Sequence, residues 1–284
     1  MSIIEAVDSL PPLREVIEQS GLVATKKLGQ NFILDQNITD KIARQAGDLS
    51  NNTVFEIGPG PGGLTRSLLR SGAKKVIAVE FDERAIKALE PLKEAARGKL
   101  EIVHADALET DLTSTCDGSR MVVANLPYNI ATPLLVGWLK QIYEDRSSYD
   151  HLVLMFQKEV AERIVAAPNT KEYGRLGVLS QWLCEAHILF DLPPSVFAPP
   201  PKVTSSVVSL KPKKEIIDAP YLQFKDVEAV TEAGFGQRRK MIRQSLKTYK
   251  PYIEELGIEE TLRAENLTVD DFIYLTRLKA GFEK

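Results

Sequence analysis

The sequence predicts an α/β fold, in which a mostly parallel sheet is covered by helices on both faces, followed by a small all-helical region. Short apolar runs rich in β-branched residues alternate with amphipathic helical stretches along most of the chain, which is typical of a parallel sheet. After Pro212 the helical periodicity continues without a convincing strand. A length of 284 residues favours two domains, at roughly 150 residues each.

The predicted elements follow one another with short connections. A helix over 11–20 begins at a Pro-Pro pair and ends at Gly21, and a second helix over 36–46 ends at Gly47. Apolar runs predict strands over 53–57, 75–79, 100–104, 120–124 and 152–156. Helices are predicted over 63–70, 83–96, 132–143, 159–167 and 175–185. Two late strands, over 187–190 and 206–210, flank a proline-rich loop, and 211–214 is expected to be a linker.

Composition and charge exclude several classes of protein. With 44% apolar and 26% charged residues, the chain is expected to be an ordinary globular protein. It has no apolar run of membrane-spanning length and no signal peptide, so we expect it in the cytoplasm. Its two cysteines and three histidines form no ligand cluster, so no metal is expected. The net charge is −3, but 202–250 holds eleven basic against five acidic residues. This stretch is either a nucleic-acid-binding region or a set of solvated helix faces.

Polar residues and a glycine follow four of the predicted strands, at the point where each strand ends. They are Gly58, Glu80, Asp106 and Asn125. Because the carboxyl ends of parallel strands meet at one edge of the sheet, these residues should lie along a single rim, where such folds bind ligands.

The first three positions of this rim predict a nucleotide-containing cofactor. Gly58, Gly60 and Gly63 have the spacing G-x-G-x-x-G, in which glycine lets the backbone turn sharply and approach a ligand closely. Glu80 lies 22 residues after Gly58 and can accept hydrogen bonds from ribose hydroxyls. Asp106 can accept one from an adenine amino group. A nicotinamide dinucleotide and S-adenosylmethionine both fit this pattern, and Glu80 and Asp106 could also be simple strand-end or turn-capping carboxylates.

The tetrad Asn125-Leu126-Pro127-Tyr128 favours S-adenosylmethionine. The amino nitrogen of adenine is a poor nucleophile because its lone pair is delocalised into the ring. Two acceptors on its N–H groups would free that lone pair: the Asn125 side-chain carbonyl and the Leu126 main-chain carbonyl, which Pro127 keeps extended. Tyr128 offers a ring on which the base can stack. Methyl transfer then depends mostly on positioning, whereas nothing in the tetrad suits hydride transfer.

The chain resembles the ribosomal RNA adenine N6,N6-dimethyltransferase family. The segments that carry the resemblance are 27–32 (KLGQNF), 56–60 (EIGPG), 79–82 (VEFD), 106–108 (DAL), 125–128 (NLPY), 196–203 (VFAPPPKV) and 235–240 (FGQRRK). The resemblance implies a class I methyltransferase fold, with a Rossmann-like, seven-stranded, mostly parallel sheet. It implies an S-adenosylmethionine-binding catalytic domain over 1–211 with an N-terminal helical lid, and a helical RNA-engaging domain over 212–284.

The resemblance also implies roles for individual residues. Asn31 and Ile33 would close over the cofactor, Gly58 and Gly60 would contact it, Glu80 would bind its ribose and Asp106 its adenine. Asn125 would lie where methyl donor and target amine meet. Phe197 would supply a second stacking face for the base, opposite Tyr128. Two purely structural interpretations remain: Asn31 could cap the helix that begins near Asp35, and Phe197 could be a buried loop anchor.

The basic residues Arg238, Arg239, Lys240 and Arg243 are predicted to share a helix, with Arg239 and Arg243 on one face. The resemblance suggests that this helix contacts RNA, with Lys202 and Arg175 nearer the mouth of the active site. The implied substrate is 16S ribosomal RNA within the small subunit or its precursor, bound by a monomer. Two alternatives are a large-subunit (23S) RNA adenine methyltransferase of the macrolide-resistance type and a non-catalytic ribosome-assembly factor. A nicotinamide oxidoreductase is a more distant alternative.

Overall fold

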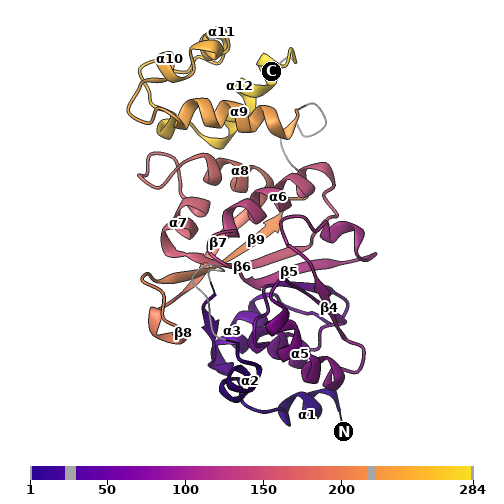
Figure 1. Cartoon of the computed structure of the whole chain (residues 1–284). Helices are drawn as coiled ribbons and strands as arrows, with labels where there is room; N and C mark the ends of the chain where they lie inside the picture. Colours follow the sequence, from indigo (N-terminus) through magenta and orange to yellow (C-terminus); the bar gives the residue numbers. More distant parts are fainter. Residues whose placement is uncertain (1, 23–29, 216–221, 283–284) are drawn as a thin grey trace.

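A computed structural model describes residues 2–22, 30–215 and 222–282 and shows a sheet-containing part with helices α9 to α12 at one end (Figure 1). The sheet has seven strands in the order β4-β3-β2-β5-β6-β9-β7. Its strands are β2 (Thr53–Ile57), β3 (Lys75–Glu80), β4 (Leu100–His104), β5 (Arg120–Asn125), β6 (His151–Gln157), β7 (Cys184–Leu192) and β9 (Ser205–Pro212). The first five pair in parallel, whereas β9 runs antiparallel to both β6 and β7.

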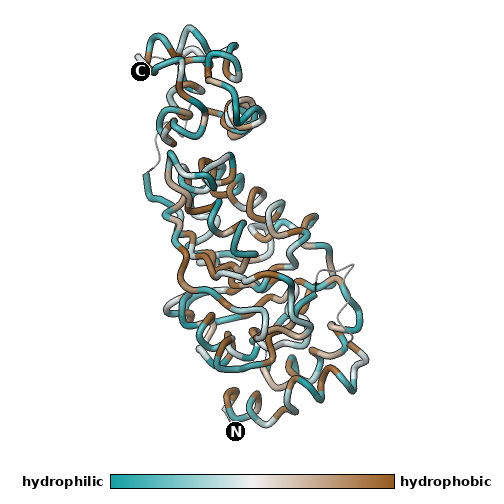
Figure 2. The backbone as a smooth tube through the Cα atoms, turned by 90° about the vertical axis from the view of Figure 1, so that its left-hand side faces the viewer, coloured by the Kyte–Doolittle hydropathy of each residue, from teal (hydrophilic) through white to brown (hydrophobic). Residues whose placement is uncertain are grey.

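Helices cover both faces of this sheet. They are α3 (Gln36–Gln45), α4 (Gly63–Arg70), α5 (Glu83–Ala95), α6 (Ala131–Glu144), α7 (Lys158–Val165) and α8 (Arg175–Leu183). Strand residues alternate between two hydrophobic clusters: Phe55 and Ile57 belong to the one that contains α6 and α8, and Val54 belongs to the one that contains α3 and α4. Because both faces are buried, β2 is an unbroken buried run, as in other parallel sheets. Figure 2 shows such hydrophobic stretches, in brown, running through the middle of the larger part.

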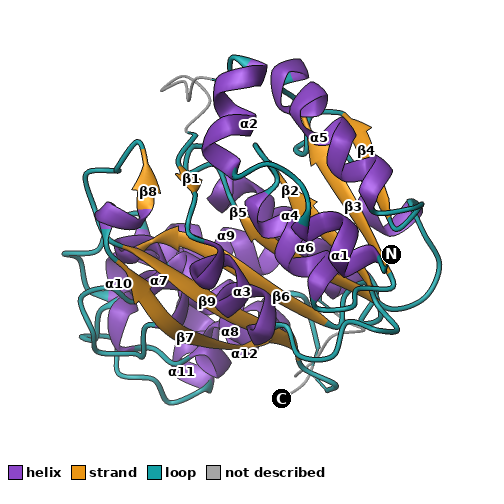
Figure 3. Cartoon of the chain, turned by 90° about the horizontal axis from the view of Figure 1, so that it is seen from below, coloured by secondary structure: helices purple, strands orange, loops and turns teal. Residues whose placement is uncertain are grey.

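The N-terminal segment adds two helices and a short strand. Helices α1 (Ile3–Asp8) and α2 (Leu13–Ser20) pack on α4 and α5 (Figure 3). Gly21 ends α2 in the left-handed conformation, as its position predicts. Strand β1 (Phe32–Ile33) pairs with β8 (Phe197–Ala198) in a separate two-stranded sheet. Neither α1 nor this small sheet was expected from the sequence.

The C-terminal helices are α9 (Phe224–Phe235), α10 (Ile242–Ser245), α11 (Lys250–Glu255) and α12 (Val269–Lys279). Their hydrophobic cluster contains Phe272 and Leu246 and extends to Tyr173 and Val178, which lie next to and within α8. The loop before α8 is therefore part of the contact between the two regions. The helical character predicted after Pro212 is confirmed.

Three local predictions were wrong. Residues 184–185 belong to β7 and not to a helix, because Cys184 and Glu185 pair with Pro212 and Lys211 of β9. The same pairing extends β9 into the segment expected to be a linker. The basic segment of 238–240 is a turn and not a helix, since α9 ends at Phe235.

Candidate active site

One cavity of about 240 Å³ lies at the carboxyl ends of β2, β3 and β5. Nine of the residues expected at the site line it: Asn31, Ile33, Gly58, Gly60, Glu80, Asp106, Asn125, Leu126 and Tyr128. The prediction that one rim gathers the residues following the strands is therefore confirmed. Residues 27–29 of the first matching segment lie outside the described residues.

The glycine loop (58–62) follows β2, and its glycines adopt backbone conformations that larger residues rarely adopt. Gly58 and Gly60 have φ values of 64° and 54°, in the left-handed region that favours glycine. A Cβ on Gly60 would lie 2.7 Å from Cε1 of Phe32, which comes from β1. A Cβ on Gly58 would lie 3.4 Å from Cγ of Pro127. The backbone of the loop therefore forms a tight wall between the N-terminal segment and the tetrad.

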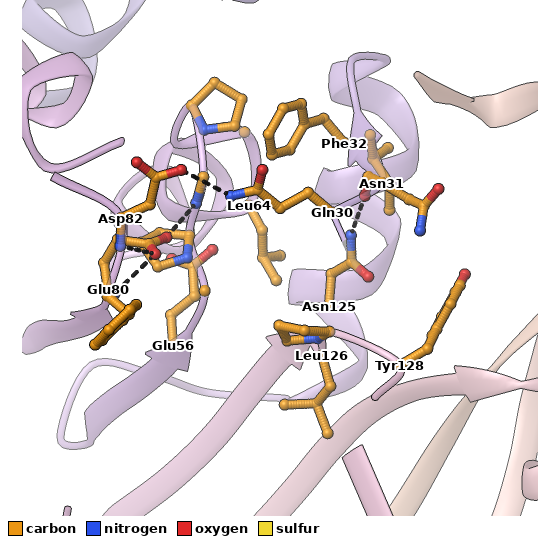
Figure 4. A pocket seen from close by; sticks show the side chains of 18 of the residues that line it. Gln30, Asn31, Phe32, Glu56, Leu64, Glu80, Asp82, Asn125, Leu126 and Tyr128 are labelled. Carbon is orange, nitrogen blue, oxygen red and sulfur yellow. Dashed lines mark hydrogen bonds between the residues drawn. The ribbon is translucent and has the colours of Figure 1, made fainter. Parts of the chain in front are cut away.

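Glu80 ends β3 and is held by main-chain donors. Its Oε1 accepts hydrogen bonds from the N–H groups of Phe81 (2.8 Å) and Asp82 (2.9 Å), and its Oε2 accepts one from Gly60 N–H (3.3 Å). Burial raises the pKa of Glu80, although these three donors lower it in part. The carboxylate thus connects the glycine loop to β3, with its oxygens beside the cavity (Figure 4).

Glu56 is a cavity residue that the sequence analysis missed. It lies inside β2, is 2% exposed, and its Oε2 has no hydrogen-bond partner in the described part of the chain. Burial raises the pKa of this carboxyl to about 8, and the charge of Glu80 adds to the effect. The sequence gives one signal for it, an acidic residue in an otherwise apolar strand directly before the glycine loop.

Other cavity residues come from the edges of the site. Asp82 accepts a hydrogen bond from Gln30 Nε2 at 3.1 Å and pairs with Arg84 at 2.6 Å, which holds its pKa at about 2. Asp106 accepts a hydrogen bond from Leu108 N–H at 2.9 Å through Oδ1, so it caps a turn and also lines the cavity. The two interpretations of Asp106 are therefore compatible.

Asn125 is fixed by a segment that is distant in sequence. Its Nδ2 donates a hydrogen bond to the main-chain carbonyl of Asn31 at 2.9 Å. The amide nitrogen is thereby engaged, and the carbonyl oxygen lies on the side toward Tyr128 (Figure 4). The cap of α3 is Asp35, whose side chain accepts from Asn37 N–H, so Asn31 does not cap that helix.

Tyr128 stands at the other side of the cavity. Its hydroxyl shares a hydrogen bond of 2.6 Å with Ser205, a fully buried residue at the start of β9. Burial raises the pKa of the Tyr128 phenol. The ring therefore remains neutral at ordinary pH and is anchored at its polar end.

Phe197 is placed differently from the expectation. It does not line the cavity, is 3% exposed, and belongs to the hydrophobic cluster that contains Ile33. The reason is the pairing of β8 with β1, which places Phe197 opposite Ile33. Phe197 is therefore packed as a buried loop anchor, and its role as a second stacking face opposite Tyr128 stays a prediction.

The basic residues lie in the C-terminal region, away from the cavity walls, and only Arg243 is on a helix, α10. Because Arg239 lies in the turn, no helix face joins it to Arg243, which corrects the predicted spacing. Arg238 donates hydrogen bonds from Nη2 to the carbonyls of Lys171 and Tyr173, each at 2.8 Å. It therefore connects the C-terminal region to the loop before α8.

Of the other two basic candidates, Lys202 is exposed, whereas Arg175 forms an ion pair with Glu228 at 2.5 Å. In the ranges that the structure describes, no group of three or more His, Cys, Asp or Glu residues is arranged to hold a metal ion. Within the same ranges, no helix is long and apolar enough to cross a membrane.

Comparison with known proteins gives consistent results. A family model described as ribosomal RNA adenine dimethylase matches residues 22–280. A ribosomal RNA small subunit methyltransferase A from Mesorhizobium japonicum is 53% identical over 279 residues, which cover 95% of this chain and 99% of the relative. One of the same name from Azorhizobium caulinodans is 54% identical, covering 96% of this chain and 94% of the relative.

Two solved structures are also similar. A dimethyladenosine transferase from Plasmodium falciparum has a TM-score of 0.73 and 29% identity, covering 87% of this chain and 98% of that chain. The 23S rRNA methyltransferase ErmE has a TM-score of 0.65 at 24% identity, with the same two coverages, and its likeness concerns the fold alone.

Proposed function

Because this chain belongs to the ribosomal RNA adenine dimethylase family, we propose that it methylates the N6 amino groups of two adjacent adenosines near the 3′ end of 16S ribosomal RNA. It is an S-adenosylmethionine-dependent methyltransferase with a Rossmann-like, seven-stranded, mostly parallel sheet. The names of its relatives support the small subunit over the large one. The observation that carries the chemistry is the Asn125 amide, which is fixed at the cavity by Asn31.

We propose that this cavity binds the methyl donor. A Cβ on Gly60 would collide with the Phe32 ring, so glycine at this position lets the loop pack closely against β1 beside the cavity. Glu80 would bind the ribose hydroxyls and Asp106 the adenine amino group, while Asn31 and Ile33 would close the cavity from the N-terminal side. The unpartnered Oε2 of Glu56 is an acceptor for a cationic group. S-adenosylmethionine supplies an electrophilic methyl group on a sulfonium.

The tetrad would prepare the target amine. With its Nδ2 donating to Asn31, the Asn125 amide presents its carbonyl oxygen as an acceptor for one N–H of the adenine. The Leu126 main-chain carbonyl would accept from the other N–H, which frees the nitrogen lone pair. The Tyr128 ring, anchored by Ser205, would stack on the base, and such stacking stabilises a bound base by about 1–3 kcal/mol. We propose that no metal takes part.

We further propose that two parts of the chain have different roles. Residues 1–211 would form the catalytic domain with an N-terminal helical lid, and 212–284 would form the RNA-engaging domain. Four exposed residues would contact phosphates: Arg239, Lys240, Arg243 and Lys202. These contacts should weaken as the salt concentration rises. We propose that Arg238 acts indirectly, by fixing the loop before α8. The protein would work as a cytoplasmic monomer on the small subunit or its precursor.

Transfer to isolated subunits tests the function. The protein is incubated with labelled S-adenosylmethionine and either small or large subunits from unmethylated cells, and the label is mapped by mass spectrometry. We expect dimethyladenosine in small-subunit RNA. Label in large-subunit RNA alone would contradict the proposal, and binding without transfer would favour an assembly factor.

Two variants test the amine activation. Asn125→Ala should abolish transfer while subunit binding persists, because the acceptor oxygen is removed without touching the RNA-engaging region. Asn37→Ala, at an exposed position of α3, is the matched control and should transfer normally. Near-normal dimethylation by Asn125→Ala would refute the assignment.

Charge reversal tests the phosphate contacts. Arg239→Glu with Arg243→Glu should weaken subunit binding, and the dependence of affinity on salt should become shallower by about two phosphate contacts. The same reversal at Lys93 and Arg97, which lie in and just after α5, is the control. Unchanged affinity at every salt concentration would show that the basic residues are only solvated.

A further inference from the structure

A second cavity, of about 380 Å³, lies behind the glycine loop. Its walls come from α2, α4 and α5, together with residues 10–11 and Pro61 of the glycine loop. Figure 3 shows α2 lying beside α5, with which it is in contact. The methyl donor site described above does not include this cavity, although Pro61 lines both.

The wall contributed by α4 carries a buried cation. Arg66 is only 9% exposed, and in the chain as described its Nε is fully buried with no hydrogen-bond partner. Burial lowers the pKa of this guanidinium, and the charge of Asp8 offsets the effect in part. The ion pair of Asp8 is with Arg70, from Oδ1 to Nη1 at 3.3 Å, and not with Arg66.

A buried cation with an unpartnered N–H group is costly to a folded protein, whereas an apolar residue of similar length would fill the same place without that cost. The burial of Arg66 therefore has a cost in stability, which an anion bound to the guanidinium would offset. Such residues are typical of binding sites, where a protein gives up stability for function.

The remaining walls indicate what the partner is. Lys87 of α5 adds a second positive charge at the exposed side, so the cavity is suited to an anion. Leu10, Val16 and Leu92 make much of the rest of the surface apolar. A fully hydrated inorganic ion would leave this apolar surface unused, whereas a ligand with an apolar body would cover it.

We propose that the second cavity binds a small organic anion, a carboxylate or a phosphate monoester with an apolar body, whose charge is held by Arg66 and Lys87. Guanidinium groups bind both kinds of anion through paired, charge-assisted hydrogen bonds. Pro61 lines both cavities and Arg66 lies on the helix that follows the glycine loop, so we expect binding at one site to change the affinity of the other.

Calorimetric titration with benzoate, phenyl phosphate and inorganic phosphate tests the site. We expect at least one organic probe to bind more tightly than inorganic phosphate, and the one that binds identifies the anionic group. Arg66→Met should weaken binding about tenfold or more, as expected for loss of a charge-assisted hydrogen bond. Lys87→Gln should weaken it less, and Lys93→Gln, an exposed position on the same helix, should leave it unchanged. Equal binding of all three probes would mean an adventitious ion only, and no binding, or binding unchanged in Arg66→Met, would overturn the proposal.

Thermal unfolding distinguishes binding from a structural role. Without a probe, Arg66→Met should unfold at the same or a higher temperature than the parent protein, because a desolvated charge is removed. With the same concentration of organic probe, the parent should be stabilised more than Arg66→Met. If Arg66→Met lowers the unfolding temperature and the probe stabilises both proteins equally, Arg66 has a structural role and the proposal fails.

Measuring how each ligand changes the affinity for the other tests whether the two sites are coupled. By reciprocity, a probe that changes the affinity for S-adenosylhomocysteine must have its own affinity changed by the same factor. In the parent protein we expect each ligand to change the affinity for the other severalfold. In Arg66→Met we expect neither affinity to change. Independent binding of the two ligands would refute the coupling through Pro61.

Discussion

Replacing Glu56 with glutamine tests the electrostatics of the methyl donor cavity. The substitution keeps the shape of a side chain that is 2% exposed and removes its charge. In the unfolded chain this carboxyl ionises near pH 4.5, whereas in the folded, ligand-free protein burial raises its pKa to about 8. As pH rises between these values, the unfolded chain loses its proton first, so unfolding becomes more favourable.

The size of the effect follows from the two pKa values. At about 1.4 kcal/mol per pKa unit, the carboxyl lowers the free energy of unfolding by at most about 3 kcal/mol at pH 7 and about 5 kcal/mol well above pH 8. Glu56→Gln should therefore match the parent protein near pH 4.5 and exceed it increasingly as pH rises. Urea denaturation of both proteins across this range, without cofactor, measures the difference.

The matched control is Glu109→Gln, which alters an exposed carboxyl and should change nothing with pH. A difference between Glu56→Gln and the parent that stays constant from acid to neutral pH would refute the reasoning. A second measurement uses the donor, whose positive charge favours ionised Glu56. Binding near pH 7 should release protons from the parent protein but not from Glu56→Gln, as read from calorimetry in buffers of different ionisation enthalpy.

Three further substitutions test single contacts. Gly60→Ala should destabilise the protein by about 1–3 kcal/mol and abolish donor binding, because its Cβ would collide with the Phe32 ring and its φ of 54° is strained. Denaturation measures the stability, and equilibrium dialysis with labelled donor measures the binding. Normal donor affinity would contradict this prediction. Ser205→Ala should lower the transfer rate and leave donor affinity unchanged, because it releases only the Tyr128 hydroxyl; a fall in donor affinity instead would point to a collapsed cavity. Arg238→Ala should lower the free energy of unfolding by about 1–3 kcal/mol and speed amide hydrogen exchange in the loop before α8. Unchanged exchange in this loop would show that the two carbonyl contacts of Arg238 are not stabilising.

Most of the sheet could be predicted from the sequence, because a strand buried on both faces is a short apolar run wherever it occurs. The prediction failed at Cys184 and Glu185, where no glycine or proline separates α8 from β7 and only pairing with β9 decides the conformation. It failed again at 238–240, although Gly236, the C-cap directly after the last residue of α9, is a helix-stop signal in the sequence.

The candidate site could be predicted only in part, because a sequence pattern gives a residue's position in the chain but not its burial or orientation. Glu56 was missed because the strand pattern shows an apolar run and does not say how deeply its one carboxyl is buried. The burial of Phe197 could not be predicted, because a motif gives its position in the chain and not the side to which the ring points. The β1–β8 pairing turns that ring into the core.

The sequence by itself determined the fold class and which residues meet at the rim. Parallel strands bring their carboxyl ends together at one edge, so Gly58, Glu80, Asp106 and Asn125 could be assigned to one site from their positions after successive strands. Only the tertiary structure decided how the amide of Asn125 is oriented. Its partner is a main-chain carbonyl 94 residues away, and contacts between such distant segments depend on packing that no local pattern contains. The same holds for the cavity around Arg66, which exists because α2 packs on α5.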